Sequence, residues 1–268
     1  MRRSVAFSWD YIKKYYYTKA IGFISIALIL VLWTLIVHFK IVPSKFLSSP
    51  IDIFREFLKL IEEGYIGTSL FSHFLASFAR TFSGFMIGCI LAIPIGIFIG
   101  YFKYLAAGLT PIMAFLRPIP AIALIPLFIL WFGIGEPAKI LLIFYSSFLY
   151  ISINTTAGVR NVPINLIRAA QTLGAKNTQI FLKVVLPEAL PQIITGIRMG
   201  AIISWAVVVA SELIAAQKGL GYMIMDAATF FRINDVYVGI LLIGMVGIAL
   251  ENLIGFLESK IVHWSGKT

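Results

Sequence analysis

Long apolar segments, separated by short polar ones, occupy most of this 268-residue chain. In lipid a backbone must satisfy its own hydrogen bonds, and these segments lack the strict alternation of a membrane β-barrel. We therefore predict about six membrane-spanning helices, at residues 20–39, 82–101, 105–131, 139–158, 192–214 and 236–261. The third segment contains four prolines, so we expect it to be kinked, tilted or partly re-entrant. The pattern predicts an all-α integral membrane protein.

Two longer connections lie on one side of these predicted helices. Residues 40–66 include PIDIFREFLKLIEEG, whose spacing predicts an amphipathic helix at the membrane interface. Residues 215–235 begin AAQKGLGY. Both connections are candidate surfaces for a partner outside the cell.

The second predicted helix has a small residue at every fourth position. These residues share nearly one helix face and allow another helix backbone to approach closely. The stripe consists of Gly84, Gly88, Ala92, Gly96 and Gly100, and a second pair, Gly196 and Gly200, occurs in the fifth predicted helix.

Residues 168–187, RAAQTLGAKNTQIFLKVVLP, are too polar to span a membrane. The spacing predicts one short amphipathic helix that Gly174 ends, and a second one that Asn177 caps and Pro187 breaks. Periodicity alone leaves two alternatives open. The segment either lies flat on lipid or provides a docking surface for a groove in another protein.

Composition and charge support a cell-membrane protein. Hydrophobic residues make up 60% of the chain, charged residues 13%, and the mean hydropathy is +0.94. The net charge of +10 does not form a basic stripe of the kind that binds nucleic acid. With the amino terminus inside, twelve of the 22 lysines and arginines lie inside and seven outside, so we predict that both termini are cytoplasmic.

We predict neither a catalytic site nor a metal site. No HExxH motif, carboxylate pair or Ser-His-Asp arrangement is present, and the single cysteine, Cys89, is expected to serve packing. The terminal SGKT, residues 265–268, is not a phosphate-binding loop, because Ile261 stands where that motif requires glycine. Any ATP must then bind to another chain.

Polar residues within or near the spans are candidates for a translocation path, and charged ones suit an anion. The set is Arg117, Ser146, Asn154, Arg198, Ser204 and Glu212, with Arg80 as a further charged residue. The alternatives are snorkelling, a structural ion pair such as Arg198 with Glu251, and hydrogen bonds between helices.

The polar segment is similar to a known motif. RAA, three residues, Gly174, nine residues and VVLP match the spacing of the EAA motif in permeases of binding-protein-dependent ABC importers. Arg168 departs from it, because the motif has glutamate there. Residues 117–140, 153–163, 186–200 and 219–224 resemble the nitrate, sulfonate, taurine and bicarbonate branch, and the resemblance covers roughly residues 69–264.

The resemblance implies a type I ABC importer permease fold, with residues 1–65 as an amino-terminal flank and residues 66–268 as the core. It also implies a homodimeric or paired permease, two ATPase subunits that bind ATP and Mg²⁺, and an extracytoplasmic substrate-binding protein. Coupling helices are expected at about residues 163–186. The coupling residues carried over by position are Arg168, Ala169, Ala170, Gln171, Leu173, Gly174, Lys176 and Pro187.

The function expected from this resemblance is ATP-driven import of a small anion, such as a sulfonate, taurine, nitrate or bicarbonate. Similar permeases import vitamin precursors such as a pyrimidine or riboflavin, which is the alternative substrate class. A secondary transporter is a further alternative, but no inverted repeat or cluster of intramembrane carboxylates supports it. A membrane-embedded enzyme would need a catalytic constellation that is not found.

Overall fold

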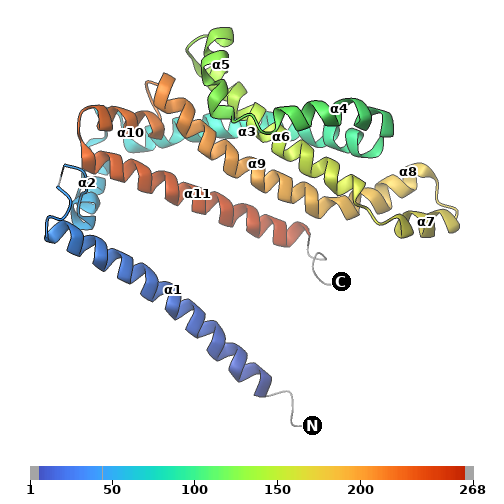
Figure 1. Ribbon diagram of the computed structural model, residues 1–268, viewed down its shortest axis with the longest axis horizontal. Coiled ribbons are helices and arrows are strands. Elements are labelled where there is room, and N and C mark those ends of the chain that lie inside the picture. The colour runs from blue at the N-terminus through green and yellow to red at the C-terminus, as the bar shows by residue number, and fades with distance from the viewer. Residues whose placement is uncertain (1–5, 44, 263–268) are drawn as a thin grey trace.

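The structure, a computed structural model, describes residues 6–43 and 45–262, and within these residues the protein is built from helices joined by short turns and loops. Arg2, Arg3, His263 and the SGKT segment lie outside these residues. Figure 1 shows the arrangement. The elements are α1 (Ala6–His38), α2 (Pro50–Glu63), α3 (Leu70–Tyr101), α4 (Lys103–Leu116), η1 (Ala121–Leu124), α5 (Ile125–Phe132), α6 (Glu136–Arg160), α7 (Ile164–Thr172), α8 (Asn177–Ile180), η2 (Phe181–Val185), α9 (Leu186–Ala215), α10 (Leu220–Thr229) and α11 (Ile233–Ile261).

The predicted number of membrane crossings is confirmed. Five helical segments are long and apolar enough to span a membrane. Helix α4 and the η1–α5 segment together form a bent pair, with an angle of 85° between them, that makes a sixth span. The proline-rich third segment is therefore broken, as its sequence predicts. Of these segments, α1 diverges from the others (Figure 1). No residue in its apolar window is buried.

The helices differ from the prediction in several places. Helix α3 begins at Leu70, earlier than expected, because Ser69 caps it by accepting the backbone N–H of Ser72. The connection 215–235 contains α10, which we did not predict. Helix α9 is continuous with α8 from Asn177 to Ile214, so Pro187 does not break it.

Helices α3, α6 and α9 pack with their backbones in close contact, as the small-residue stripe predicts. An added Cβ would approach the carbonyl oxygen of Ile140 to 2.7 Å at Gly84 and that of Ser152 to 2.8 Å at Gly96. Residue numbers increase in the same direction on both helices along this contact, so α3 and α6 run parallel. The α4–α5 segment joins them, so it must return across the full length of the bundle.

Helix α9 runs antiparallel to α6. A Cβ at Gly158 would meet Gln192 at 2.9 Å, and one at Gly196 would meet Asn154 at 2.7 Å. Residue numbers increase along α6 while those of the contacting residues on α9 decrease. The three helices therefore form a block that has α7 and α8 at one end and α2 and α10 at the opposite end (Figure 1).

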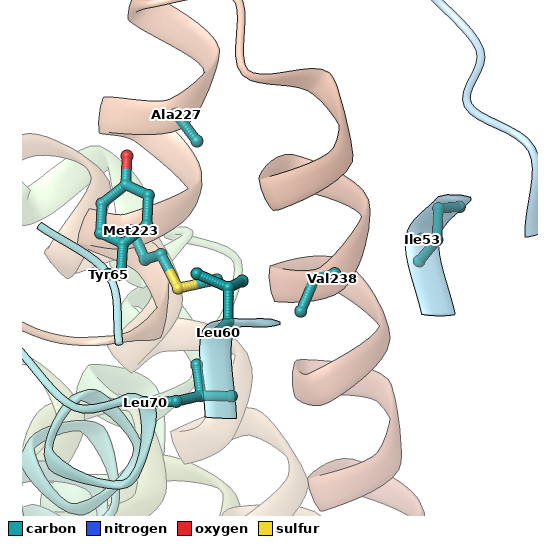
Figure 2. Close-up of a cluster of buried hydrophobic side chains, with 7 residues drawn as sticks. All are labelled: Ile53, Leu60, Tyr65, Leu70, Met223, Ala227 and Val238. Carbon is teal, nitrogen blue, oxygen red and sulfur yellow. The ribbon is translucent and has the colours of Figure 1, made fainter. Parts of the chain in front are cut away.

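A buried apolar cluster closes the α2–α10 end. Ile53 and Leu60 of α2 pack with Met223 and Ala227 of α10 and with Val238 of α11 (Figure 2). The prediction of an amphipathic α2 is confirmed, but this face packs on protein rather than on lipid. Other apolar side chains of α2 remain exposed.

Tyr65 joins the same cluster and lies between α2 and α3. It is 2% exposed, and its hydroxyl donates a hydrogen bond of 2.6 Å to Asp226 of α10. Burial and this carboxylate raise the pKa of Tyr65 above its ordinary value, so it remains a neutral donor.

Buried charges join α3, α6 and α9 at this same end. Arg80 of α3 donates hydrogen bonds to Glu136 at 2.7 Å, to Glu212 at 2.5 Å and to the carbonyl of Lys218 at 2.6 Å. The side chain of Glu212 is fully buried, whereas that of Glu136 is 53% exposed. Lys139 lies 3.5 Å from Glu136.

Glu212 and its neighbours also hold the connection between α9 and α10. Its carboxylate accepts from the Ser77 hydroxyl at 2.8 Å and from the Gly221 N–H at 3.0 Å. Ser77 in turn accepts the N–H of Leu220 at 2.9 Å, and His73 Nδ1 lies 3.2 Å from the N–H of Gly219. We name Arg80, Glu136, Glu212, Ser77 and His73 the charged cluster.

The Gly96→Leu substitution is expected to destabilise the block, because the Ser152 carbonyl cannot yield to a larger side chain. Overpacking of this kind costs about 1–3 kcal/mol. Gly244→Leu is the matched control, since no atom lies within 4 Å of a Cβ at that position. Thermal unfolding in detergent measures both variants, and equal melting temperatures would contradict the packing described here.

The Glu212→Ala substitution is expected to destabilise the protein more than Glu251→Ala does. Removing one partner of a buried ion pair costs about 3–5 kcal/mol, whereas a pair as exposed as Arg198–Glu251 contributes about 0–1 kcal/mol. Thermal unfolding compares the two variants. Proteolysis within residues 216–221 should also accelerate only in Glu212→Ala, and unchanged cleavage there would be evidence against the anchoring role of Glu212.

Candidate functional site

The polar segment forms a helical hairpin that ends in a tight turn. The N–H of Ala175 donates to the Ala170 carbonyl at 3.1 Å, and the N–H of Gly174 donates to that of Gln171 at 2.9 Å. Gly174 has φ +76°, and a Cβ there would have no atom within 4 Å. The turn therefore requires glycine because of its left-handed backbone conformation, as the sequence predicts. A Cβ atom at this position would not clash with neighbouring atoms.

The second arm of the hairpin differs from the prediction. The backbone N–H of Lys176 donates to the Gln179 side chain at 2.8 Å, so the cap lies one residue before Asn177. The chain then passes through the π-helical segment η2 into α9. Because Pro187 has no N–H and its ring crowds the preceding turn, this wider segment lets the helix continue through the proline.

The hairpin presents one face outward and anchors the other. Ala170 is half-buried and, together with Ile167, packs on a buried cluster that includes Val159, Ile180 and Val185. The side chain of Leu173 is 88% exposed. The other exposed residues predicted for coupling are Arg168, Ala169, Gln171, Gly174 and Lys176.

Most candidate path residues bind their own or a neighbouring helix. Ser146 is buried and donates to the Ile143 carbonyl at 2.8 Å. Asn154 accepts from Gln192 of α9 at 3.1 Å. Ser204 is fully buried, and its hydroxyl has no hydrogen-bond partner within the described residues.

The charged candidates lie apart from one another. Arg198 pairs with Glu251 at 2.9 Å and with Glu258 at 3.4 Å, so the structural ion pair considered above is present. Glu212 belongs to the charged cluster at the α2–α10 end. Arg117 follows the last residue of α4 and lines a cavity beside α6. The structure therefore does not gather the six candidates into one site.

Several members of the charged cluster were not predicted from the sequence. Arg80 and Glu212 were noticed singly, whereas Ser77, His73 and Glu136 were not connected with them. Helix α3 begins earlier than predicted, which places Ser77 and Arg80 inside a helix rather than before one. The predicted topology puts the start of α3 and the end of α9 on the same side, and this was the available signal for their pairing.

Comparisons with known proteins identify the family. The family described as "Binding-protein-dependent transport system inner membrane component" matches residues 92–263. The taurine transport system permease protein TauC of Escherichia coli (strain K12) is 36% identical, covering 93% of this chain and 90% of that protein. The nitrate import permease protein NrtB of Synechocystis sp. is 32% identical, covering 89% and 88%.

A solved structure supports the fold. The inward-facing MetNI methionine ABC transporter aligns with a TM-score of 0.59 and 23% identity, covering 70% of this chain and 91% of that one. The family match spans more than half of the chain, and the two permeases are similar over most of it. This chain belongs to the family of binding-protein-dependent transport system inner membrane components and is a multi-pass permease subunit of the plasma membrane.

Proposed function

We propose that the chain is the permease of an ATP-driven importer of a small anion, such as a sulfonate, taurine, nitrate or bicarbonate, and that its α7–α8 hairpin docks on the ATPase. The exposed face of this hairpin, around the left-handed turn at Gly174, is the observation that carries the proposal. A short protruding helix suits a groove in a partner protein. The relatives named above supply the anion class.

The hairpin is built to transmit a displacement. Ile167 and Ala170 pack on the ends of α6 and α9, and the second arm continues into α9 without a break. A partner that moves the hairpin would therefore move α9 along its length, up to Glu212. This link suits alternating access, in which helices move against one another around a path.

The complete importer would contain a second permease copy, two ATPase subunits and an extracytoplasmic substrate-binding protein. ATP and Mg²⁺ would bind to the ATPase. In this arrangement the hairpin faces the cytoplasm, and the α2–α10 end, with Phe230 and Phe231 exposed, faces the binding protein. Strongly exposed apolar side chains on and after α5, among them Leu130 and Ile134, suit lipid or the second permease copy.

The Gly174→Glu substitution is expected to abolish import and ATPase binding without preventing membrane insertion, because it strains the turn and adds charge on the docking face. Gly67→Glu is the matched control. Gly67 has φ +71° and equally open surroundings, but it lies at the opposite end. Co-purification of the ATPase is the measurement, and wild-type retention in Gly174→Glu would contradict the proposal.

The Arg168→Glu substitution is expected to weaken ATPase binding, although it restores the residue found in the motif. Residues 137–187 contain no acidic residue, and the hairpin carries Arg168, Lys176 and Lys183. A groove that receives this surface should be acidic, so reversing one exposed charge should lower the affinity about two- to tenfold.

Binding measured at low and high salt tests this charge effect. The difference between wild type and Arg168→Glu should shrink at high salt, since exposed charges are screened. Arg55→Glu, an exposed change on α2, should leave the affinity unchanged. Equal or tighter binding by Arg168→Glu would contradict an acidic groove.

A further inference from the structure

A cavity of about 360 Å³ lies between α3, α4 and α6, in the half of the bundle nearer the hairpin. Ile99, Met113 and Ile153 form part of its apolar wall. Arg117, directly after α4, and Arg160, the last residue of α6, both line it. Two arginines from different parts of the chain therefore line one largely apolar hollow.

Neither arginine has a carboxylate partner among the described residues. The polar side-chain contact of Arg160 is a hydrogen bond of 3.2 Å to the Thr110 hydroxyl. By contrast, Arg80 and Arg198 each pair with two carboxylates. Between Glu63 and Glu188 the sequence contains one acidic residue, Glu136, which belongs to the charged cluster at the opposite end. The segments that form the cavity, α3, α4 and the second half of α6, therefore contain basic residues but no acidic one.

The helix dipole explains only part of this arrangement. A cation near a helix carboxyl terminus is favourable, which accounts for one arginine at the end of α4 and one at the end of α6. It does not account for their lining the same cavity. Both residues are exposed at helix ends, so their guanidinium groups remain accessible to a ligand that enters the cavity.

We propose that this cavity binds the oxyanion group of a small organic anion between the guanidinium groups of Arg117 and Arg160. Guanidinium groups match sulfonate, carboxylate and phosphate oxygens with paired hydrogen bonds. The apolar wall accepts a short alkyl part, and the volume lies within the usual range of ligand sites, about 300–1,000 Å³. That the bound anion is the transported one rests on the proposed function, whereas the binding itself does not.

A neighbouring hollow extends the positive charge toward the hairpin end. It shares Thr110, Ala114 and Arg160 with the cavity and adds Lys103, the first residue of α4. An anion leaving the cavity would thus meet a further cation. A lipid headgroup phosphate has the same chemistry as a transported anion, so the experiment has to distinguish these two sources.

Thermal unfolding of the full-length permease in phosphatidylcholine nanodiscs tests the site, with sodium ethanesulfonate as the probe and sodium chloride at equal ionic strength as the reference. A ligand that binds the native state raises the melting temperature. We expect a saturable rise for wild type and an affinity weakened by about tenfold or more in Arg117→Gln and Arg160→Gln. Arg55→Gln, which removes an exposed charge on α2, should keep the wild-type response.

A second variant keeps the test decisive if the arginine variants fold poorly. Ala114→Leu retains both charges but places a larger side chain in the cavity wall, so it should also lose the ethanesulfonate response. A response that persists in Ala114→Leu and in the arginine variants, or no response in wild type, would overturn the site.

Nanodiscs containing phosphatidylglycerol distinguish the two sources of the anion. Competition between this lipid and ethanesulfonate at the two arginines supports one shared oxyanion site. Stabilisation by the lipid alone would overturn the assignment to a transported anion. Absence of ATP-driven uptake, with arginine-dependent binding of ethanesulfonate retained, would contradict the proposed function but not the binding site.

Discussion

Close backbone contact between α3, α6 and α9 is the constraint on which the rest of the structure depends. Lipid tails are as apolar as leucine, so membrane helices gain little from simple apolar burial and associate through close packing. The glycines of α3 bring its backbone against the carbonyls of Ile140 and Ser152. This contact fixes the register of α3 on α6 and, through Gly196, the register of α9.

Each end of the three-helix block has its own chemistry. At the α2–α10 end, Arg80 and Glu212 neutralise each other and hold the connection after α9. At the opposite end, the hairpin has no acidic residue and exposes Leu173 beside its basic side chains. Helix α9 joins the two ends. The block therefore combines a surface suited to a partner with a rigid path to the far side of the membrane.

Local sequence patterns predicted the elements well, because their causes are local. Apolar length predicted the spans, the prolines predicted the broken α4–α5 pair, and the spacing around Gly174 predicted the hairpin turn. The small-residue stripe predicted a close helix contact but did not identify α6 as its partner. These features follow from hydropathy and backbone conformation, which a single segment determines.

Features that depend on contacts between distant segments were not predicted. Arg80 and Glu212 are 132 residues apart, and their pairing follows from the register of α3 and α9. Pro187 was expected to break a helix, but the π-helical turn before it lets the helix continue. Arg117 and Arg160 come from different helices, and only their packing brings them to one cavity.

Cysteine labelling at Leu173 tests the central claim most directly, which is that the hairpin docks on a cytoplasmic ATPase. The variant Leu173→Cys is made in a Cys89→Ala background, since Cys89 is the single cysteine of the chain. A membrane-impermeant maleimide should label it in inside-out vesicles stripped of the ATPase, and adding the ATPase back should block the labelling. Labelling in right-side-out vesicles, or labelling that the ATPase does not reduce, would contradict the claim.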